Sequence, residues 1–338
     1  MKIQLLIATE DSDYAEHLSD TLSENYANAM DVSVCTISEQ FHELLNLRKF
    51  DLALLEASMV GDTDLQSIQV PLLLWTDELS QGDLRQEMSS VYKYQRISVM
   101  VSKMLELYAK GTKNEHGPDS KRGYITAFWS PAGGVGKTTA ALAYAAGRAA
   151  EGMDALYLDL EHFSSVRTYF ADSGRSLSAV FEMLEYGEGS IRMLIKSICK
   201  VDNDSGISYL CCPENYDDVN ILSTENIAAL TDACASVTDE LIIDMSCACD
   251  SRAQKIFDLA DRIFIVSDPS TGSQIKLKQF VSQHNVFQQI KGKSTLINNK
   301  GGATTEPITQ TSISLPLVQS SDPVIIYKTL SEICLRQL

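Results

Sequence analysis

One stretch, residues 129–139, constrains the fold of this chain more than any other. It reads Trp-Ser-Pro-Ala-Gly-Gly-Val-Gly-Lys-Thr-Thr, follows an apolar run at 124–128 that is typical of a β-strand, and precedes an alanine-rich run at 138–150 that is typical of a helix. A strand, a glycine-rich loop ending in Gly-Lys-Thr and a helix, in that order, form the setting of a phosphate-binding loop. The sequence therefore predicts a nucleotide site here.

Each residue type in this loop has a chemical use. The backbone N–H groups expected to face phosphate oxygens are those of Gly133, Gly134, Val135 and Gly136. Lys137 adds a point charge for the outer phosphates, Thr138 offers a hydroxyl to Mg²⁺, and the helix N-terminus adds a partial positive charge. The alternative, an ordinary glycine-rich turn before a buried helix, leaves the Gly-Lys-Thr unexplained.

Composition limits the class of protein. A chain of 338 residues can form two domains with separate cores, and 44% apolar with 22% charged residues is ordinary for a soluble globular protein. No run approaches the about 20 apolar residues that span a bilayer, and residues 1–5 begin a strand without a signal-peptide pattern. Eight scattered cysteines without framework spacing favour a reducing cytoplasm. The formal charge of −17 argues against nucleic acid or an anionic membrane as a direct partner.

The first domain, residues 1–110, alternates strand-like and helix-like runs, which predicts a parallel sheet covered on both faces. The expected strands are 3–8, 32–36, 51–55 and 70–75, and the expected helices are 14–24, 38–47 and 97–108. An unrelated small α/β domain is the alternative to the resemblance described next.

This domain resembles a response-regulator receiver, which implies a flavodoxin-like fold. The positions that match the receiver pattern are Thr9, Glu10, Asp11, Glu56, Thr76 and Lys93. Glu56 stands where that family has its phosphoacceptor aspartate, and Thr9 replaces one of its Mg²⁺-binding acids. Because glutamate cannot form the aspartyl phosphate of that family, the resemblance predicts a pseudo-receiver that docks partners rather than a phosphorylation switch. Short segments after the third strand and at 81–90 also suggest that local helices are missing.

A polar linker without periodicity is expected at 111–122, and a second α/β domain at 123–338. In this second domain strands are expected at 124–128, 155–161, 207–211, 241–244, 262–266 and 294–298. Helices are expected at 138–150, 176–186, 191–199, 224–234, 253–259 and 323–336, and residues 273–287 are expected to be mostly helical. Several acids end these strands, and an isolated acid in such a position is commonly a helix N-cap or a solvated strand end.

The second domain resembles the deviant Walker A ATPases, the group of MinD, ParA and the nitrogenase iron protein. The resemblance rests on residues 133–139 followed in order by Asp159, Glu161, Asp244 and Asn298. It implies a P-loop NTPase with a mostly parallel sheet that binds ATP and Mg²⁺. Lys137 would contact the outer phosphates, and Thr139 would help hold the inner ones. The Mg²⁺-associated residues would be Thr138, Asp159 and Asp244, with Asp244 acting through water.

The same resemblance implies roles for three more residues. Glu161 would be the second acid of the first switch, which normally orients the attacking water. Asn298 would bind the adenine edge, and Pro316 would pack on the base. In place of the group's signature lysine stands Ala132, and Pro131 replaces a glycine. A cation supplied to the phosphoryl transition state is worth about 10³–10⁵ in rate. Its absence, with Glu161 in place of an aspartate, predicts slow or absent hydrolysis.

The order of a receiver-like domain and such an ATPase is similar to the pilus-assembly family of TadZ and CpaE, which marks the assembly site of tight-adherence pili at a cell pole. It implies a cytoplasmic homodimer near a pole, bound to ATP. The partner would be a pilus or secretion assembly protein or a polar marker, contacted through the N-terminal domain, and any membrane contact would be indirect or weak. The apolar stripe of the last helix, Ile326, Leu330 and Ile333, is too short and too poor in cations for a typical membrane anchor.

Two alternatives remain. One is a cycling ParA- or MinD-type partition or positioning ATPase. The other is an electron-transfer protein like the nitrogenase iron protein, because Cys247 follows Asp244 at that protein's ligand spacing and Cys249 is close by. A cluster that bridges a dimer needs two cysteines per subunit, and Cys211-Cys212 does not match the second ligand position.

Overall fold

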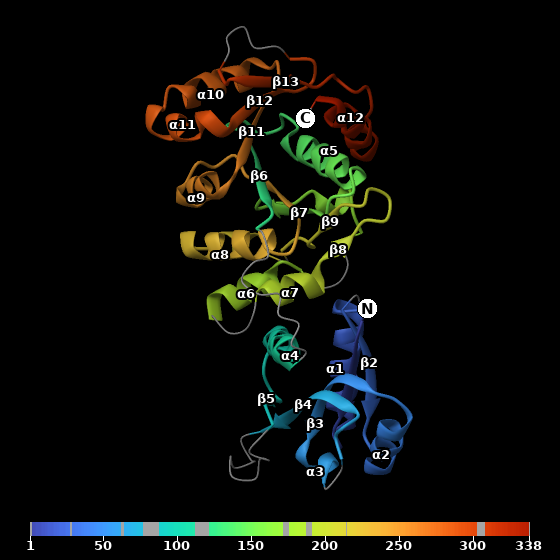
Figure 1. Ribbon diagram of the computed structural model, residues 1–338. Coiled ribbons are helices and arrows are strands. Elements are labelled where there is room, and N and C mark those ends of the chain that lie inside the picture. Colours follow the sequence, from blue (N-terminus) through green and yellow to red (C-terminus); the bar gives the residue numbers. More distant parts are fainter. Residues whose placement is uncertain are drawn as a thin grey trace. The chain divides into compact units, whose positions relative to one another are not determined.

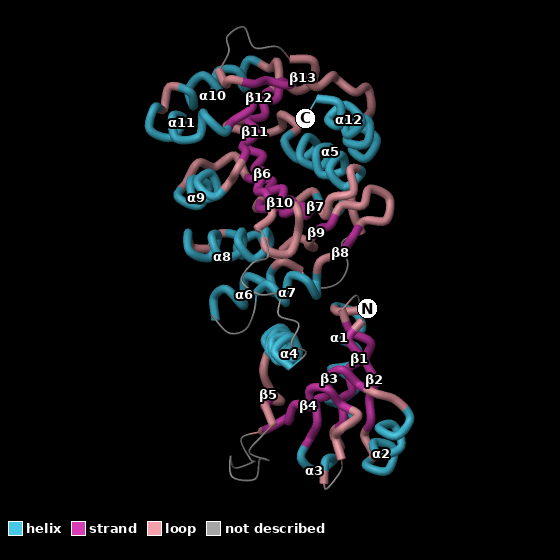
Figure 2. The backbone as a smooth tube through the Cα atoms, in the orientation of Figure 1, coloured by secondary structure: helices cyan, strands magenta, loops and turns pink. Residues whose placement is uncertain are grey.

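The computed structural model describes residues 2–27, 29–61, 64–76, 88–111, 122–171, 176–186, 191–213, 215–302 and 308–337. The chain divides into two compact units, Met1–Ser120 with Glu182–Ile198, and Lys121–Phe181 with Cys199–Leu338. Each unit has its own sheet (Figures 1 and 2). Residues 112–121 of the expected linker lie outside the described residues, and Glu182–Ile198 groups with the first unit rather than with the rest of 123–338.

The first unit contains a five-stranded sheet with the strand order β2-β1-β3-β4-β5, in which all pairs are parallel. Its strands are β1 (Ile3–Ala8), β2 (Met30–Cys35), β3 (Phe50–Glu56), β4 (Ile68–Trp75) and β5 (Ser90–Tyr92). This is the flavodoxin-like order, in which successive strands are added on one side of β1 and then, from β3 on, on its other side. The predicted flavodoxin-like parallel sheet is confirmed.

Helices cover both faces of this sheet. They are α1 (Ser12–Asn25), α2 (Ser38–Leu47), α3 (Ala57–Val60) and α4 (Ile97–Gly111), with α7 (Ile191–Ile198) in the same unit. On one face Phe41 of α2 and Met59 of α3 are buried in one cluster. On the other face the hydroxyl of Tyr14 in α1 lies 3.9 Å from the sulfur of Met100 in α4. A helix of four residues follows β3, so the helix there is shortened and not missing as expected, whereas the prediction for 81–87 lies outside the described residues.

The second unit contains an eight-stranded sheet with the order β13-β12-β11-β6-β10-β7-β9-β8. Its strands are β6 (Tyr124–Trp129), β7 (Ala155–Leu160), β8 (Lys200–Val201), β9 (Ser208–Tyr209), β10 (Glu240–Met245), β11 (Arg262–Ser267), β12 (Ser294–Asn298) and β13 (Thr311–Ser314). Only the β8–β9 pair among these strands is antiparallel, so the predicted mostly parallel sheet is confirmed. Every residue of β7 and β10 is buried, as expected for central strands covered on both faces.

Two helix layers enclose this sheet (Figure 1). One layer holds α5 (Lys137–Ala150) and α12 (Pro323–Gln337), and the other holds α8 (Thr224–Ala235), α9 (Ser251–Leu259), α10 (Thr271–Val281) and α11 (His284–Ile290). The remaining elements are α6 (Ser178–Tyr186) and the 3₁₀ turns η1 (Val166–Thr168), η2 (Tyr216–Val219) and η3 (Lys291–Lys293). The helix predicted at 273–287 is interrupted between α10 and α11.

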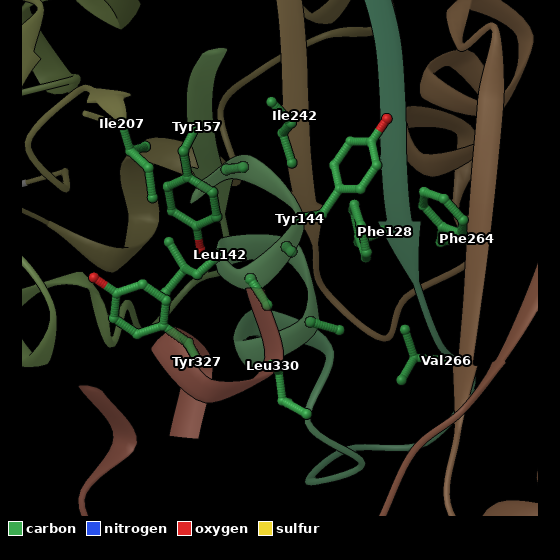
Figure 3. Packing of buried hydrophobic residues seen from close by; sticks show 14 of the residues in the cluster. Phe128, Leu142, Tyr144, Tyr157, Ile207, Ile242, Phe264, Val266, Tyr327 and Leu330 are labelled. Carbon is green, nitrogen blue, oxygen red and sulfur yellow. The ribbon is translucent and has the colours of Figure 1, made fainter. Parts of the chain in front are cut away.

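The core of the second unit lies between its sheet and the α5–α12 layer. Figure 3 shows Phe128 and Phe264 of the sheet beside Tyr144 of α5, and Leu142 of α5 near Tyr157 of β7. Ile242 of the sheet and Tyr327 and Leu330 of α12 belong to the same cluster. Tyr327 and Leu330 are buried, and the neighbouring Ile326 packs against the cluster. The apolar side of α12 is therefore used for packing inside the unit. Among the described residues, no helix combines the length and the apolar character needed to cross a bilayer.

Candidate functional site

The glycine-rich loop lies between β6 and α5, as predicted. Gly134 has φ +74° and Gly136 has φ +87°, a left-handed conformation that glycine adopts without a steric penalty. Gly136 directly precedes α5, whose first residue is Lys137. A cavity of about 280 Å³ opens at the loop. It is lined by Ala132, Gly133, Gly134, Gly136, Lys137, Thr138, Glu161 and Cys247.

The acids predicted for this site come from two neighbouring strands. β7 and β10 are parallel, and Asp159 and Asp244 are paired directly across them. Glu161 follows the end of β7 and lines the cavity. The structure therefore brings together Lys137, Thr138, Asp159, Glu161 and Asp244, all at the carboxyl edge of the sheet, where ligands bind in open α/β folds.

The ammonium group of Lys137 is the centre of this arrangement. Its Nζ lies 2.8 Å from Asp244 Oδ1 and also donates to Glu161 Oε1. Lys137 and Asp244 are both buried. Burial lowers the pKa of Lys137, but the charges of Asp244 and Glu161 more than offset this and raise its pKa above the usual value. Lys137 is therefore a fixed cation beside the glycine-rich loop.

Asp159 lies in a different electrostatic setting. Burial, and next the charge of Asp244, raise the pKa of Asp159 to about 7. Its carboxylate accepts hydrogen bonds from the Ser164 hydroxyl and, at 2.8 Å, from the backbone N–H of Glu161. Asp244 accepts a further hydrogen bond from the Tyr157 hydroxyl at 2.9 Å. The carboxylates of Asp159 and Asp244, at paired positions of neighbouring strands, repel each other when both are charged, and a bound cation would offset this repulsion.

Asn299 and Lys300, which sequence reasoning missed, contact the glycine-rich loop from the segment after β12. Asn299 Nδ2 donates to the Val135 carbonyl oxygen at 2.8 Å, and Lys300 Nζ donates to the Gly134 carbonyl oxygen at 2.7 Å. Lys300 also lies 3.0 Å from Asp268 Oδ2. The polar residues that follow the apolar strand were the available signal, because ligand sites gather at carboxyl ends of parallel strands.

Other predicted residues have definite places. Asn298 is buried, and its carbonyl oxygen accepts a hydrogen bond from the backbone N–H of Leu315 at 2.9 Å. Pro316 is the residue after Leu315. Neither Asn298 nor Pro316 lines the 280 Å³ cavity. Thr139 lies in the first turn of α5, directly after Thr138. Cys247 lines the cavity, and burial raises the pKa of its thiol, which disfavours the thiolate.

A second polar cluster lies at the carboxyl edge of the first unit's sheet. Lys93 is buried and its Nζ lies 3.1 Å from Asp11 Oδ2 and 3.1 Å from Glu56 Oε1. The Thr9 hydroxyl donates to Glu56 Oε2 at 2.5 Å, and the Glu10 N–H donates to the same oxygen at 3.0 Å. Thr76 directly follows β4. The Glu56 carboxylate is thus held by three donors from neighbouring segments.

Comparison with known proteins bears on the fold of the chain. No protein-family model matches the sequence, and no curated protein sequence matches it. A crystal structure of a ParA family ATPase from Chlorobium tepidum covers 63% of this chain and 92% of its own length, with 18% identity and a TM-score of 0.51. Over that part, the fold of this chain is similar to the fold of the ParA family ATPase.

Two more solved structures are similar at lower scores. A septum site-determining protein MinD from Pyrococcus horikoshii, complexed with Mg-ADP, has 15% identity, covers 62% of this chain and 95% of its own, and has a TM-score of 0.45. Cobyrinic acid a,c-diamide synthase from Mycobacterium smegmatis, with bound ATP analogue and magnesium, has 18% identity, covers 63% and 95%, and has a TM-score of 0.46.

Proposed function

We propose that this chain is an ATP-binding localisation or scaffold factor for assembly of a tight-adherence pilus or a related secretion machine, acting as a homodimer with slow or no hydrolysis. The observation that carries the nucleotide part is the position of Lys137, a buried cation at the first turn of α5, directly after a loop with two left-handed glycines. Loop N–H groups, a helix N-terminus and a lysine at one point make a strong anion site.

The residues present fit a nucleoside triphosphate with Mg²⁺. Lys137 is balanced by the carboxylates of Asp244 and Glu161, so an incoming phosphate would take over the ammonium and leave those carboxylates to a divalent cation. Mg²⁺ prefers oxygen ligands, which Thr138, Asp159 and Asp244 supply. Burial, and next the charge of Asp244, raise the pKa of Asp159, and a divalent cation bound there would offset both effects. When bound, Mg²⁺ would supply stabilisation of charge on the phosphoryl oxygens.

Slow hydrolysis is supported by the residues around the loop. Ala132, which stands in place of the expected signature lysine, lines the cavity and brings no cation to it. Glu161, the candidate for orienting water, stands where the resembled ATPases have an aspartate, so its carboxylate is carried on one more methylene group. Binding depends on the loop, Lys137 and the Mg²⁺ ligands, so it is expected to survive where turnover does not.

The first unit would serve as the docking module. The Glu56 carboxylate occupies the place of the phosphoacceptor and is held by Lys93, Thr9 and the Glu10 N–H. This network supports a domain that is fixed in one state and is not switched by phosphorylation. Its partner would be a pilus assembly protein or a polar marker, and the chain would act in the cytoplasm at a cell pole.

The test measures the mass of the purified protein by light scattering and identifies the nucleotide extracted from it. A dimer that retains intact ATP supports the scaffold. A monomer that dimerises with ATP and separates as phosphate appears, at roughly one turnover per second or faster, would instead establish a cycling ParA- or MinD-type ATPase.

Two further observations test the other parts of the proposal. Brown protein after anaerobic purification would support the electron-transfer alternative through Cys247. Polar localisation that persists after deletion of residues 1–110 would refute the docking role.

A further inference from the structure

The segment after β12, residues 299–302, binds the glycine-rich loop at two consecutive peptide groups. Asn299 Nδ2 lies 2.8 Å from the carbonyl oxygen of Val135, and Lys300 Nζ lies 2.7 Å from the carbonyl oxygen of Gly134. Lys300 and Gly134 are 166 positions apart in the sequence. The contacts are directed to backbone oxygens, so they act on the loop's shape and not on any one of its side chains.

Lys300 is held in an unusual conformation. Its φ of +55° is in the left-handed region, and within the described parts of the chain no other non-glycine residue has a positive φ. Such a conformation costs energy, and it persists where surrounding contacts enforce it, often at functional sites. Here the enforcing contacts are Gly134 and the Asp268 carboxylate, which lies 3.0 Å from Nζ and whose own side chain is 10% exposed. Lys300 is thus a fixed cation at the outside of the loop.

The ammonium group of Lys300 strengthens a hydrogen-bond donor of the loop, because it binds the carbonyl of the same peptide group. The carbonyl of Gly134 and the N–H of Val135 belong to the same peptide group. An ammonium on the carbonyl polarises that group and makes its N–H a stronger hydrogen-bond donor, because linked hydrogen bonds strengthen one another. Val135 N–H is one of the donors expected to face phosphate.

We propose that Lys300 is a positioning residue for the phosphate-binding loop, which increases affinity for any ligand with a polyphosphate group without touching the phosphates. The proposal rests on the proposed function in requiring that the loop binds nucleotide. It assigns to Lys300 a different role from that of a signature lysine, which would contact phosphate directly.

The experiment compares the wild-type chain with Lys300→Met and Lys300→Arg by calorimetric titration. The probes are ADP, a non-hydrolysable ATP analogue and inorganic triphosphate, each in Mg²⁺ buffer. Lys293→Met is the matched control, because Lys293 also donates to backbone carbonyls, those of Asp258 at 3.2 Å and Ala260 at 2.8 Å, but at the other end of β12. We expect Lys300→Met to raise the Kd of all three probes about tenfold, which corresponds to about 1.4 kcal/mol. Lys300→Arg should recover most of the loss, and Lys293→Met should bind like wild type.

The outcomes separate this inference from the function on which it rests. If the wild-type chain binds no nucleotide, the proposed function fails and the inference with it. If wild type binds and Lys300→Met binds equally well, only the inference fails. A loss confined to the ATP analogue would mean direct contact with the outermost phosphate and would overturn the positioning role. Unchanged binding of inorganic triphosphate with weaker nucleotide binding would overturn it too, because Lys300 would then act on the base side alone.

Discussion

The Nζ of Lys137 lies 2.8 Å from Asp244 Oδ1, so one buried ion pair joins the first turn of α5 to the end of β10. Asp244 is fully buried, and Lys137 is 6% exposed. Removing one partner of such a pair leaves an uncompensated buried charge. Loss of binding in a Lys137 variant would therefore combine a missing phosphate contact with a less stable fold.

We predict that Lys137→Met lowers the free energy of unfolding by about 3–5 kcal/mol, because Asp244 loses its partner inside the protein. The double variant Lys137→Met with Asp244→Asn should recover a large part of that loss, since it removes both charges. Urea unfolding of the wild type, both single variants and the double variant measures this. Strictly additive effects would contradict the prediction, because they would mean that the two charges do not interact.

A second prediction concerns pH. The pKa of Asp159 is raised from 3.8 to about 7, first by burial and next by the charge of Asp244. Between about pH 4 and pH 7 the folded state therefore binds more protons than the unfolded state, and this residue's contribution to stability falls as pH rises. Asp159→Asn should remove that dependence and make the nucleotide-free protein more stable than wild type at pH 8, by up to about 4 kcal/mol.

Thermal or urea unfolding from pH 4 to pH 8 measures the effect, with Asp258→Asn, which removes an exposed carboxylate on α9, as the control. The two curves of Asp159→Asn and wild type should converge near pH 4 and separate as pH rises. A wild-type advantage at pH 8 would show that a charged Asp159 stabilises the fold and would contradict the assignment.

Much of the fold follows from local patterns in the sequence. The continuous apolar runs of β7 and β10 predicted central strands, and the loop at 129–139 predicted the strand and helix on either side of it. Two local details were not predicted. The mostly helical stretch expected at 273–287 is divided between Val281 and His284, where no glycine or proline gives a signal. The two-residue strand β8 directly follows the helix expected at 191–199 and was not expected as a strand.

The residues of the candidate site were likewise predictable only in part. Asp159 and Asp244 could be placed together because both end parallel strands, and such ends meet at one edge of a sheet. The contacts of Asn299 and Lys300 with the loop could not be predicted, because both side chains bind backbone carbonyl oxygens, those of Val135 and Gly134. A carbonyl is present in every residue, so the sequence carries no mark of which one a distant side chain will reach.

The polar cluster of the first unit gives a third prediction. Lys93 is 4% exposed and balances Asp11 and Glu56. The pKa of Glu56 is lowered overall, although burial raises it, because Thr9 and Lys93 bind its carboxylate. Lys93→Met should therefore destabilise the first unit by about 1–3 kcal/mol, the cost of leaving a partly buried carboxylate without its donor. Lys93→Met with Glu56→Gln should be more stable than Lys93→Met alone, which differential scanning calorimetry can measure.

A buried acid at the opposite edge of the second unit's sheet gives a fourth prediction. Glu240 is 1% exposed, and its carboxylate accepts from the Thr126 hydroxyl at 2.5 Å, the Tyr144 hydroxyl at 2.7 Å and Arg148 Nε at 2.7 Å. Glu240→Ala should lower the free energy of unfolding by about 3–5 kcal/mol, because it removes a buried partner of Arg148 and leaves two hydroxyls unpaired.

The control for Glu240 is Glu151→Ala. Glu151 is the second carboxylate bound to Arg148, but it lies only three positions further along the chain, directly after the end of α5, and its side chain is 43% exposed. An exposed pair at this spacing contributes about 0.2–0.5 kcal/mol. Equal effects of the two substitutions in urea unfolding would show that burial of Glu240 does not decide the strength of the interaction.

The last prediction separates backbone strain from a close contact at the glycine-rich loop. Gly136 has φ +87°, and a Cβ added there would lie 2.3 Å from Asn299 Nδ2. Gly152 has φ +84°, and an added Cβ would meet nothing within 4 Å. Both Gly136→Ala and Gly152→Ala therefore carry a left-handed alanine, at about 1–2 kcal/mol. Only Gly136→Ala must also displace the Asn299 amide from Val135, so it should lose about 1 kcal/mol more, the typical net value of that hydrogen bond. In an Asn299→Ala background the two alanine substitutions should cost nearly the same, and a persistent difference would show that Asn299 does not set the limit at Gly136.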